Sequence, residues 1–431
     1  PMDEEVRILE RALDVFTEIG DRAGLGWTHA RLVVPLLMQA RHEEGEAAGR
    51  TALETLEPLG ERPELADALQ RLGWFLWRRG RNDEAEPLLR RAVEMAERLG
   101  APLVRAEATQ TLGVCLVQMG RTAEGIDMTE EAYRLAKEVG EFSNLMRCYN
   151  NLPALVGDYA SDFAKAETVL REGRELAQRA GAKSHQGWIT GSLGDVAFKL
   201  GRLEESESFQ REAVELAVAV GDEPLRGMRL IGLAAALLFR GRLEDARAVL
   251  EEAIPIVRAN PEPQADLYVP MFQGHLALVR GDPATAADRF SQTVELLRAF
   301  NVDAEPSAFV DLVRALQRAG RAGQAETYRD LSEHGSSPAA RANATLVEGL
   351  LAESPVEAHR LLADGVGSLE GLGLRIDAAR GMVDAGRAMA RVGEDPRETF
   401  QRARDILVGC GANAFLFELP DASATLDRGS D

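Results

Sequence analysis

The stretch LADALQRLGWFLWRRGRNDEAEPLLRRAVEMAERLG, from Leu65 to Gly100, decides the fold of this chain. Apolar residues recur in it at steps of three and four, which predicts two amphipathic helices. Gly80 is expected to end the first helix and Gly100 the second, because glycine tolerates a positive φ, while Asn82 can cap the second helix. Neither helix can bury its apolar face alone, so the unit must stack on copies of itself.

Copies of this unit follow along the chain with one period. Glycines expected to end second helices recur at a step of 40 or 41, at Gly20, Gly60, Gly100, Gly140, Gly181 and Gly221. The turn inside each pair is marked by a second series, with Arg after most members: Ala40 (in the first slot), Gly80, Gly120, Gly201, Gly241, Gly281 and Gly320. This spacing predicts an all-α, right-handed solenoid of about ten antiparallel helix pairs, preceded by one lone helix.

The regularity of the repeats suggests three regions. Residues 1–335 are expected to form the main array, residues 336–419 degenerate helical repeats that continue the solenoid, and residues 420–431 a disordered tail. The fourth pair departs from the pattern, because its turn near residue 160 is longer and Pro153 lies inside its first helix. Two interpretations stay open for this pair: a tolerated insertion, or a bend or lip on a binding groove.

Four dipeptides predict helix starts in the second half of the chain. Each places a side-chain acceptor at the N-cap and a proline at the first helical position, where a missing N–H costs nothing. They are Asp282-Pro283, Ser337-Pro338, Ser354-Pro355 and Asp395-Pro396.

Bulk properties exclude several classes of function. The formal net charge of −20 disfavours binding to nucleic acid or to an anionic membrane surface, and it favours a neutral or basic partner. The three cysteines, Cys115, Cys148 and Cys410, lie far apart and suit small core positions in a reducing compartment. With no apolar run long enough for a membrane span and no signal peptide, the chain is expected to be cytoplasmic.

The unit also carries a family resemblance. Leu-Gly in its first helix, a glycine at the turn, and Ala, Leu and Ala in the second helix resemble the tetratricopeptide repeat, through Leu72-Gly73, Gly80, Ala85, Leu89 and Ala92. The period of about 40 residues is longer than the usual 34, and Gly125 and Ser206 replace the small Ala in later copies. Such long-period arrays resemble the sensor arrays of bacterial signal-transduction ATPases, among them the large LuxR-type transcriptional regulators typified by the maltose-regulon activator.

The resemblance implies a non-catalytic sensor domain that follows a nucleotide-binding switch module in a larger regulator. Such an array receives a peptide, protein or small-molecule effector in its concave groove. The chain itself has no GxxxxGK[ST] phosphate loop, so no switch function is transferred to any of its residues. The chain also begins like the second helix of a pair, as a piece of a longer protein would.

In tetratricopeptide-like stacking, the first helix of each pair lines the groove. Alignment on the Leu-Gly step predicts the groove residues Trp27, Asp67, Gln70, Trp74, Trp77, Glu107, Gln110, Arg147, Asn150, Trp188, Asp195, Tyr268, Met271 and His275, with Gln118 and Met228 on the same pattern. Aromatic faces with amides and carboxylates between them suit a peptide segment or a sugar. The competing interpretation is that the aromatic residues pack in the core between helix pairs, and for Trp77, on the apolar stripe, we prefer it.

No residue spacing in the sequence predicts a catalytic site or a metal site. The six histidines are scattered, and His42-Glu43-Glu44-Gly45-Glu46 lacks the second histidine of a zinc helix, so we expect no metal and no cofactor. Three functions compete: a sensor array, a stand-alone scaffold or adaptor that captures a partner peptide, and an enzyme on a helical array. An enzyme would need clustered titratable groups, and the sequence predicts none, so we expect no catalysis.

Overall fold

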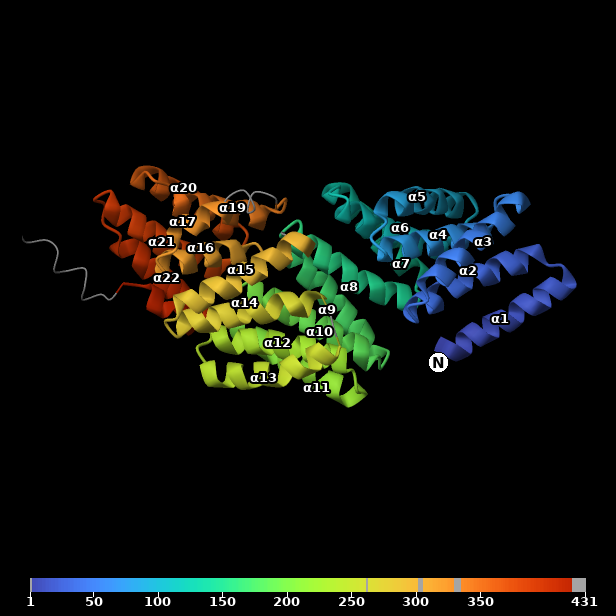
Figure 1. The fold of residues 1–431 in the computed structure, drawn as a ribbon, viewed down its shortest axis with the longest axis horizontal. Coiled ribbons are helices and arrows are strands. Elements are labelled where there is room, and N and C mark those ends of the chain that lie inside the picture. Colours follow the sequence, from blue (N-terminus) through green and yellow to red (C-terminus); the bar gives the residue numbers. More distant parts are fainter. Residues whose placement is uncertain (1, 261–262, 301–304, 329–334, 421–431) are drawn as a thin grey trace, which may run out of the picture. The chain divides into compact units, whose positions relative to one another are not determined.

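The structure is a computed structural model that describes residues 2–260, 263–300, 305–328 and 335–420 (Figure 1). Within these ranges the chain consists of α-helices and short 3₁₀ helices and contains no strand, which confirms the predicted all-α repeat fold. The contacts divide the chain into two compact units, Pro1–Leu155 (unit 1) and Val156–Asp431 (unit 2), and the division falls inside a helix. The predicted boundary at residue 335 stays a prediction. Nearly all of the predicted disordered tail lies outside the described residues.

Unit 1 begins with a lone helix, α1 (Met2–Ile19), as predicted. Three complete helix pairs and most of one further helix follow: α2 (Arg22–Met38) with α3 (His42–Leu56) and the 3₁₀ turn η1 (Glu57–Leu59), α4 (Pro63–Arg78) with α5 (Asn82–Arg98), α6 (Pro102–Gln118) with α7 (Thr122–Val139), and α8 (Phe142–Asp158) up to Leu155. Pro153 lies within α8, and the helix continues past it.

The first helices of the pairs form the inner layer of unit 1. α2 packs against α4 and α4 against α6, while each second helix packs against its own partner. Between the layers lie the apolar residues of the repeat, among them Leu69, Leu72, Leu89 and Ala92, which are buried. Burial of such side chains contributes about 1.5–3 kcal/mol each. The side of α2, α4, α6 and α8 that faces away from the second helices is called here the inner face of unit 1.

The turn glycines adopt the conformation that the sequence predicts. Gly80 has a φ of 72°, and both glycine series lie in the left-handed region throughout. Ala40 takes the same conformation, with a φ of 59°, although an L side chain is disfavoured there. One capping prediction was wrong: Asn82 is the first residue of α5 and its side chain does not cap the helix but donates to Gln118.

The arginine after each turn glycine joins one repeat to the preceding one. Arg81 donates to Glu84 in its own helix and, across 2.7 Å, to Glu46 of the previous pair. The same bond, always to the residue 35 positions earlier, recurs in Arg121–Glu86, Arg202–Glu167 and Arg242–Glu207. These four bonds are called here the inter-repeat ladder. Single surface ion pairs are worth little, but a ladder of them favours one stacking register.

Unit 2 continues from α8 with α9 (Phe163–Arg179) and further pairs. They are α10 (Lys183–Lys199) with α11 (Leu203–Val220), α12 (Glu223–Phe239) with α13 (Leu243–Ala259), α14 (Pro263–Val279) with α15 (Pro283–Phe300), α16 (Ser307–Arg318) with α17 (Ala322–Ala325) and η2 (Glu326–Tyr328), α19 (Pro338–Leu351) with α20 (Pro355–Gly371), and α21 (Arg375–Arg391) with α22 (Arg397–Cys410). A last 3₁₀ segment, η3 (Asn413–Glu418), ends the described chain.

The predicted caps of unit 2 are largely confirmed. The side chains of Asp282, Ser337 and Ser354 each accept from the backbone N–H three residues on, at 3.1, 3.0 and 3.4 Å. The fourth prediction was wrong by one position, because α22 begins at Arg397, after the proline. The carboxylate of Asp395 accepts from the Arg397 N–H instead.

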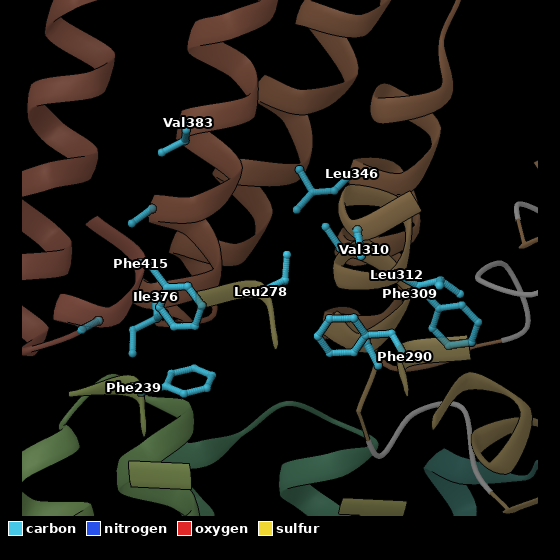
Figure 2. Close-up of a cluster of buried hydrophobic side chains, with 14 of the residues drawn as sticks. Phe239, Leu278, Phe290, Phe309, Val310, Leu312, Leu346, Ile376, Val383 and Phe415 are labelled. Atoms are coloured by element: carbon cyan, nitrogen blue, oxygen red, sulfur yellow. The ribbon is translucent and has the colours of Figure 1, made fainter. Parts of the chain in front are cut away.

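Most of unit 2 packs around one large apolar cluster, and a smaller one lies around Ile231 and Val257. Figure 2 shows side chains from helices far apart in sequence, such as Phe239 of α12, Leu346 of α19 and Phe415 of η3, in the same cluster. A hydrogen bond also joins distant parts of the unit, because Ser161 accepts from the backbone N–H of Ala339 at 3.1 Å. The first helices α10, α12 and α14 pack in succession, as in unit 1, and the side they share with α16 and α21 is called here the inner face of unit 2. No helix in the described part of the chain is long and apolar enough to span a bilayer.

Candidate functional site

The inner helices of unit 1 carry the predicted groove residues of the first four pairs. They come from each inner helix in turn: Trp27 on α2; Asp67, Gln70, Trp74 and Trp77 on α4; Glu107, Gln110 and Gln118 on α6; Arg147 and Asn150 on α8. Within this set the charged residues lie in a row across the inner helices, Gln70 and Gln110 are buried, and Asn150 is exposed.

Alternating charges cross this face from α2 to α8. Asp67 accepts two hydrogen bonds from the Arg71 Nε, at 3.0 and 2.9 Å, and lies 3.7 Å from the Arg31 Nε. Asp67 is 7% exposed, so its charge is largely removed from water and depends on these two arginines. Sequence alignment missed both, because arginine is frequent throughout the chain and these two carry no distinguishing spacing.

Two half-buried charges continue the row on α6 and α8. Burial raises the pKa of Glu107, although Arg147 and Arg71 oppose the shift, and burial lowers the pKa of Arg147. The Arg147 guanidinium donates to the Thr111 hydroxyl at 3.3 Å. Among the described residues, no ion pair closer than 4.0 Å is made by Glu107 or by Arg147. The carboxylate and the guanidinium are thus desolvated without a direct charged partner.

The three tryptophans of unit 1 are half-buried on the inner helices. The guanidinium of Arg31 lies 5.0 Å from the centre of the Trp27 ring. Trp74 and Trp77 pack against the cluster around Leu72 and Leu76, in agreement with the core interpretation preferred for Trp77. Each still has an accessible part of its ring that a ligand can contact.

The amides divide into buried and exposed groups. Gln70 and Gln110 are 4% and 0% exposed, and the Gln110 Nε2 donates to the Cys148 sulfur, so both occupy the space between helices. Asn150 is exposed and its side chain donates to Asn151 at 3.2 Å. Of the two asparagines, Asn150 therefore presents its amide to solvent, where a ligand can reach it.

In unit 2 the predicted residues Trp188 and Asp195 belong to one polar cluster on α10. Arg229 of α12 stacks 5.2 Å from the Trp188 ring centre and donates to Asp195 at 3.0 Å, and Gln210 donates to Asp195 at 2.7 Å. Arg229 and Gln210 are 5% and 1% exposed. A Cβ on residue 191 would lie 2.1 Å from Arg229, so glycine at this position leaves room for the arginine side chain.

Three further predicted residues, Tyr268, Met271 and His275, lie on α14 and pack against the core of unit 2. Burial raises the pKa of Tyr268 well above its usual value. His275 is 5% exposed, its Nε2 lies 3.5 Å from Asp311, and burial lowers its pKa to about 4. The imidazole is therefore neutral at pH 7. It touches the ring of Phe415 from η3, so the chain itself covers the place where the sequence predicted a ligand.

The described residues contain no group of three or more His, Cys, Asp or Glu side chains placed to hold a metal ion. A cavity of about 20 Å³ in unit 2, lined by Asp158, Lys199 and Asp377 among others, has room for about one water. Lys199 is paired with Glu305 at 2.6 Å.

Comparison with known proteins agrees with this architecture. The tetratricopeptide repeat family matches residues 36–98 and 185–259, which is less than half of the chain, and no curated protein sequence matches it. A Rap protein complexed with competence and sporulation factor is 14% identical, with a TM-score of 0.51 over 91% of this chain and 99% of that one. RapI in its apo form is 10% identical, with a TM-score of 0.54 over 63% of this chain and 97% of that one.

A third similar structure is a signal transduction ATPase with numerous domains and a tetratricopeptide repeat sensor, from Pyrococcus horikoshii. It is 12% identical, with a TM-score of 0.40 over 97% of this chain and 54% of that one, too low to support an argument. At such identities the Rap structures show the fold alone. The chain is a tetratricopeptide-like helical repeat array, a protein-interaction fold.

Proposed function

We propose that this chain is the sensor array of a larger cytoplasmic regulator and that it binds an extended peptide segment of its effector on the inner face of unit 1. In that regulator a nucleotide-binding module upstream of the array would receive the signal. One observation carries the proposal: Glu107 and Arg147 are half-buried, oppositely charged and without a direct charged partner on neighbouring inner helices.

A peptide group complements this pair. The carboxylate of Glu107 accepts hydrogen bonds and the guanidinium of Arg147 donates them, so one peptide N–H and one peptide C=O would satisfy both at once. Hydrogen bonds to ionised groups contribute about 1.5–3 kcal/mol, more than those between neutral groups. An extended segment presents such groups at every residue, whereas most small apolar effectors present few.

The neighbours of the pair fit the same ligand. Exposed Asn150 can pair with a further peptide group, and the accessible edges of Trp27 and Trp74 offer contact area for apolar side chains. The alternating row through Arg31, Asp67 and Arg71 supplies both signs of charge. A Rap protein of this fold was solved in complex with competence and sporulation factor, which is a precedent for a bound factor on such an array.

The test uses peptides, because the effector is unidentified. A phage-displayed library of random peptides is selected on the wild-type chain, and the enriched peptides are titrated against Glu107→Gln and Arg147→Gln. We expect each change to weaken binding by about tenfold, the loss of one charge-assisted hydrogen bond.

Arg134→Gln and Glu138→Gln are the matched controls, because this exposed pair lies on α7, the second helix of the pair whose first helix carries Glu107. Binding should be unchanged in both. The proposal fails if no peptide is enriched on the wild-type chain, or if the enriched peptides bind the Glu107 and Arg147 variants as tightly as the controls.

A further inference from the structure

The last described segment of the chain, η3, occupies the inner face of unit 2. It packs against α12, α14 and α21, all of them first helices of their pairs, and against the end of α22. This is the same kind of face on which unit 1 carries its row of charges. A short non-repeat segment thus lies where a repeat array of this kind offers its binding surface.

Two side chains of η3 anchor it. A 3₁₀ helix has three residues per turn, so residues i and i+3 lie on one side, and this places Phe415 and Glu418 on the same side. They are 0% and 3% exposed, whereas Phe417 on another side is 48% exposed. The segment therefore contacts the inner face of unit 2 through an aromatic side chain and through the carboxylate three positions later.

The aromatic anchor fits a pocket built from separate repeats. The Phe415 ring meets Phe239 of α12 edge to face, with ring centres 4.7 Å apart, and His275 of α14 at 6.0 Å. The guanidinium of Arg380 of α21 lies 4.2 Å from its ring centre. Cation–π contacts that are removed from water are worth about 2 kcal/mol.

The carboxylate anchor is bound by arginines from two helices. Glu418 accepts from the Arg380 Nε at 3.0 Å and from Arg318 of α16 at 3.1 Å. Arg387 of α21 donates to the backbone carbonyl of the same residue. Burial alone would raise the pKa of Glu418, but Arg380, Arg314 and Arg318 outweigh it and lower the pKa to about 2.

Four arginines and two aspartates surround the place that Glu418 occupies. Arg380 and Arg314 are buried and pair with the buried carboxylates of Asp311 and Asp384, whereas the side chains of Arg318 and Arg387 are 26% and 41% exposed. Arg380 is 1% exposed. Without Glu418, Arg380 would keep Asp311 as its ion-pair partner, and Arg318 would lose the carboxylate with which it pairs, so this surface favours an acidic residue at that position.

We propose that the inner face of unit 2 is a second peptide-binding surface, selective for an aromatic residue followed three positions later by a carboxylate. The chain's own residues 413–418 occupy this surface, and a partner protein with a segment of that chemistry competes with them. The proposal is independent of the peptide site proposed for unit 1, since it rests on other residues and another surface.

The short link between α22 and η3 determines how this surface can be tested. Gly411 and Ala412 alone separate α22 from η3, so the chain's own segment competes at an effective concentration of about 1 mM or more. A free peptide can bind measurably only when the anchors of η3 are weakened and the receiving helices are left intact. Phe415→Ala combined with Glu418→Gln achieves this in the full chain.

The probe is a labelled synthetic peptide with the sequence GANAFLFELP, residues 411–420, titrated by fluorescence anisotropy. We expect binding to the double variant and binding at least tenfold weaker to the wild-type chain. A peptide with the same two changes should bind neither. The proposal is overturned if the double variant is folded by circular dichroism and does not bind the unchanged peptide.

A second measurement on the wild-type chain decides the question if the double variant does not fold. Native-state hydrogen exchange compares amides of residues 413–419 with those of α21. We expect η3 to exchange through local opening, at least tenfold faster than the slowest amides of α21. Equal protection in both segments would show that η3 is an inseparable part of the core, and would overturn the proposal.

Discussion

The guanidinium of Arg380 lies 4.2 Å from the centre of the Phe415 ring, and the arginine side chain is 1% exposed. A cation this deeply buried is tolerated because three groups share its charge: the ring of Phe415 and the carboxylates of Asp311 and Glu418. Two of the three come from the last segment of the chain. The stability of unit 2 therefore depends on residues that lie outside its helix pairs.

Glu418→Gln should destabilise unit 2 by about 3 kcal/mol, because it removes one charge from a buried pair and leaves Arg380 undercompensated. The loss is measured by hydrogen exchange of the slowest amides of α21. Glu398→Gln, at an exposed position of α22, is the control and should change stability by less than about 0.5 kcal/mol. Equal effects of the two changes would contradict the buried-pair account.

His275 should make unit 2 sensitive to mild acid. Its pKa is lowered to about 4 by burial, so the unfolded chain, with a pKa near 6.5, binds the proton more tightly. The stabilisation is fully present above pH 6.5 and is lost as the pH falls toward 4, by about 2 kcal/mol between pH 7 and pH 5. Hydrogen exchange of α14 at the two pH values measures this loss, and His275→Gln should abolish most of it.

The inter-repeat ladder is most concentrated at Glu207, whose side chain is 8% exposed. It accepts from Arg211 and Arg242, at 2.8 and 2.9 Å, and from Arg240. Burial raises its pKa, but these arginines outweigh that effect and the net shift is downward. Glu207→Gln should cost about 2 kcal/mol in urea unfolding, since the pairs are partly buried.

Glu223→Gln serves as the comparison, because Glu223 is half exposed and pairs only weakly with Arg226, at 3.4 Å. We expect a loss below about 0.5 kcal/mol there. A similar cost at both positions would mean that the ladder contributes no more than an ordinary surface pair.

Ala40→Gly should stabilise unit 1 by about 0.5–1 kcal/mol, because Ala40 is held at a φ of 59° where glycine is unstrained. Gly80→Ala is the inverse experiment at the equivalent turn, with open space for the added methyl, and should cost about 1 kcal/mol. Chemical denaturation followed by tryptophan fluorescence measures both, since Trp27, Trp74 and Trp77 all lie in unit 1. If the two changes shift stability in the same direction, strain at Ala40 is refuted.

The repeat architecture could be predicted because its causes are local. Gly80 and its equivalents need a left-handed turn, and the apolar steps around Leu72 and Leu89 need helices, so period and helix order follow from short segments. The failures at Asn82 and Asp395 are also local. No side chain caps the start of α5, and α22 begins one residue later than its sequence predicts.

The candidate sites were less predictable, because they depend on contacts between distant repeats. Alignment placed Glu107 and Arg147 on the correct helices, but their lack of direct charged partners appears only once α6 and α8 are side by side. For His275 the pattern predicted a groove position, and the structure adds Phe415, 140 residues later, on top of it. No periodic pattern in NAFLFE indicates that this segment returns to the inner face.

The inter-repeat ladder has a consequence for how such a chain can change in length. Each bond joins a residue to one 35 positions earlier, and the bonding arginines Arg81 and Arg121 are themselves 40 residues apart. Duplication or deletion of a whole 40-residue block leaves every donor opposite an acceptor, whereas an insertion of any other size between Glu86 and Arg121 separates one pair. The ladder thus favours changes of length by whole repeats. In evolution or in engineering, the array can gain or lose complete repeats, whereas the gain or loss of part of a repeat costs an inter-repeat bond.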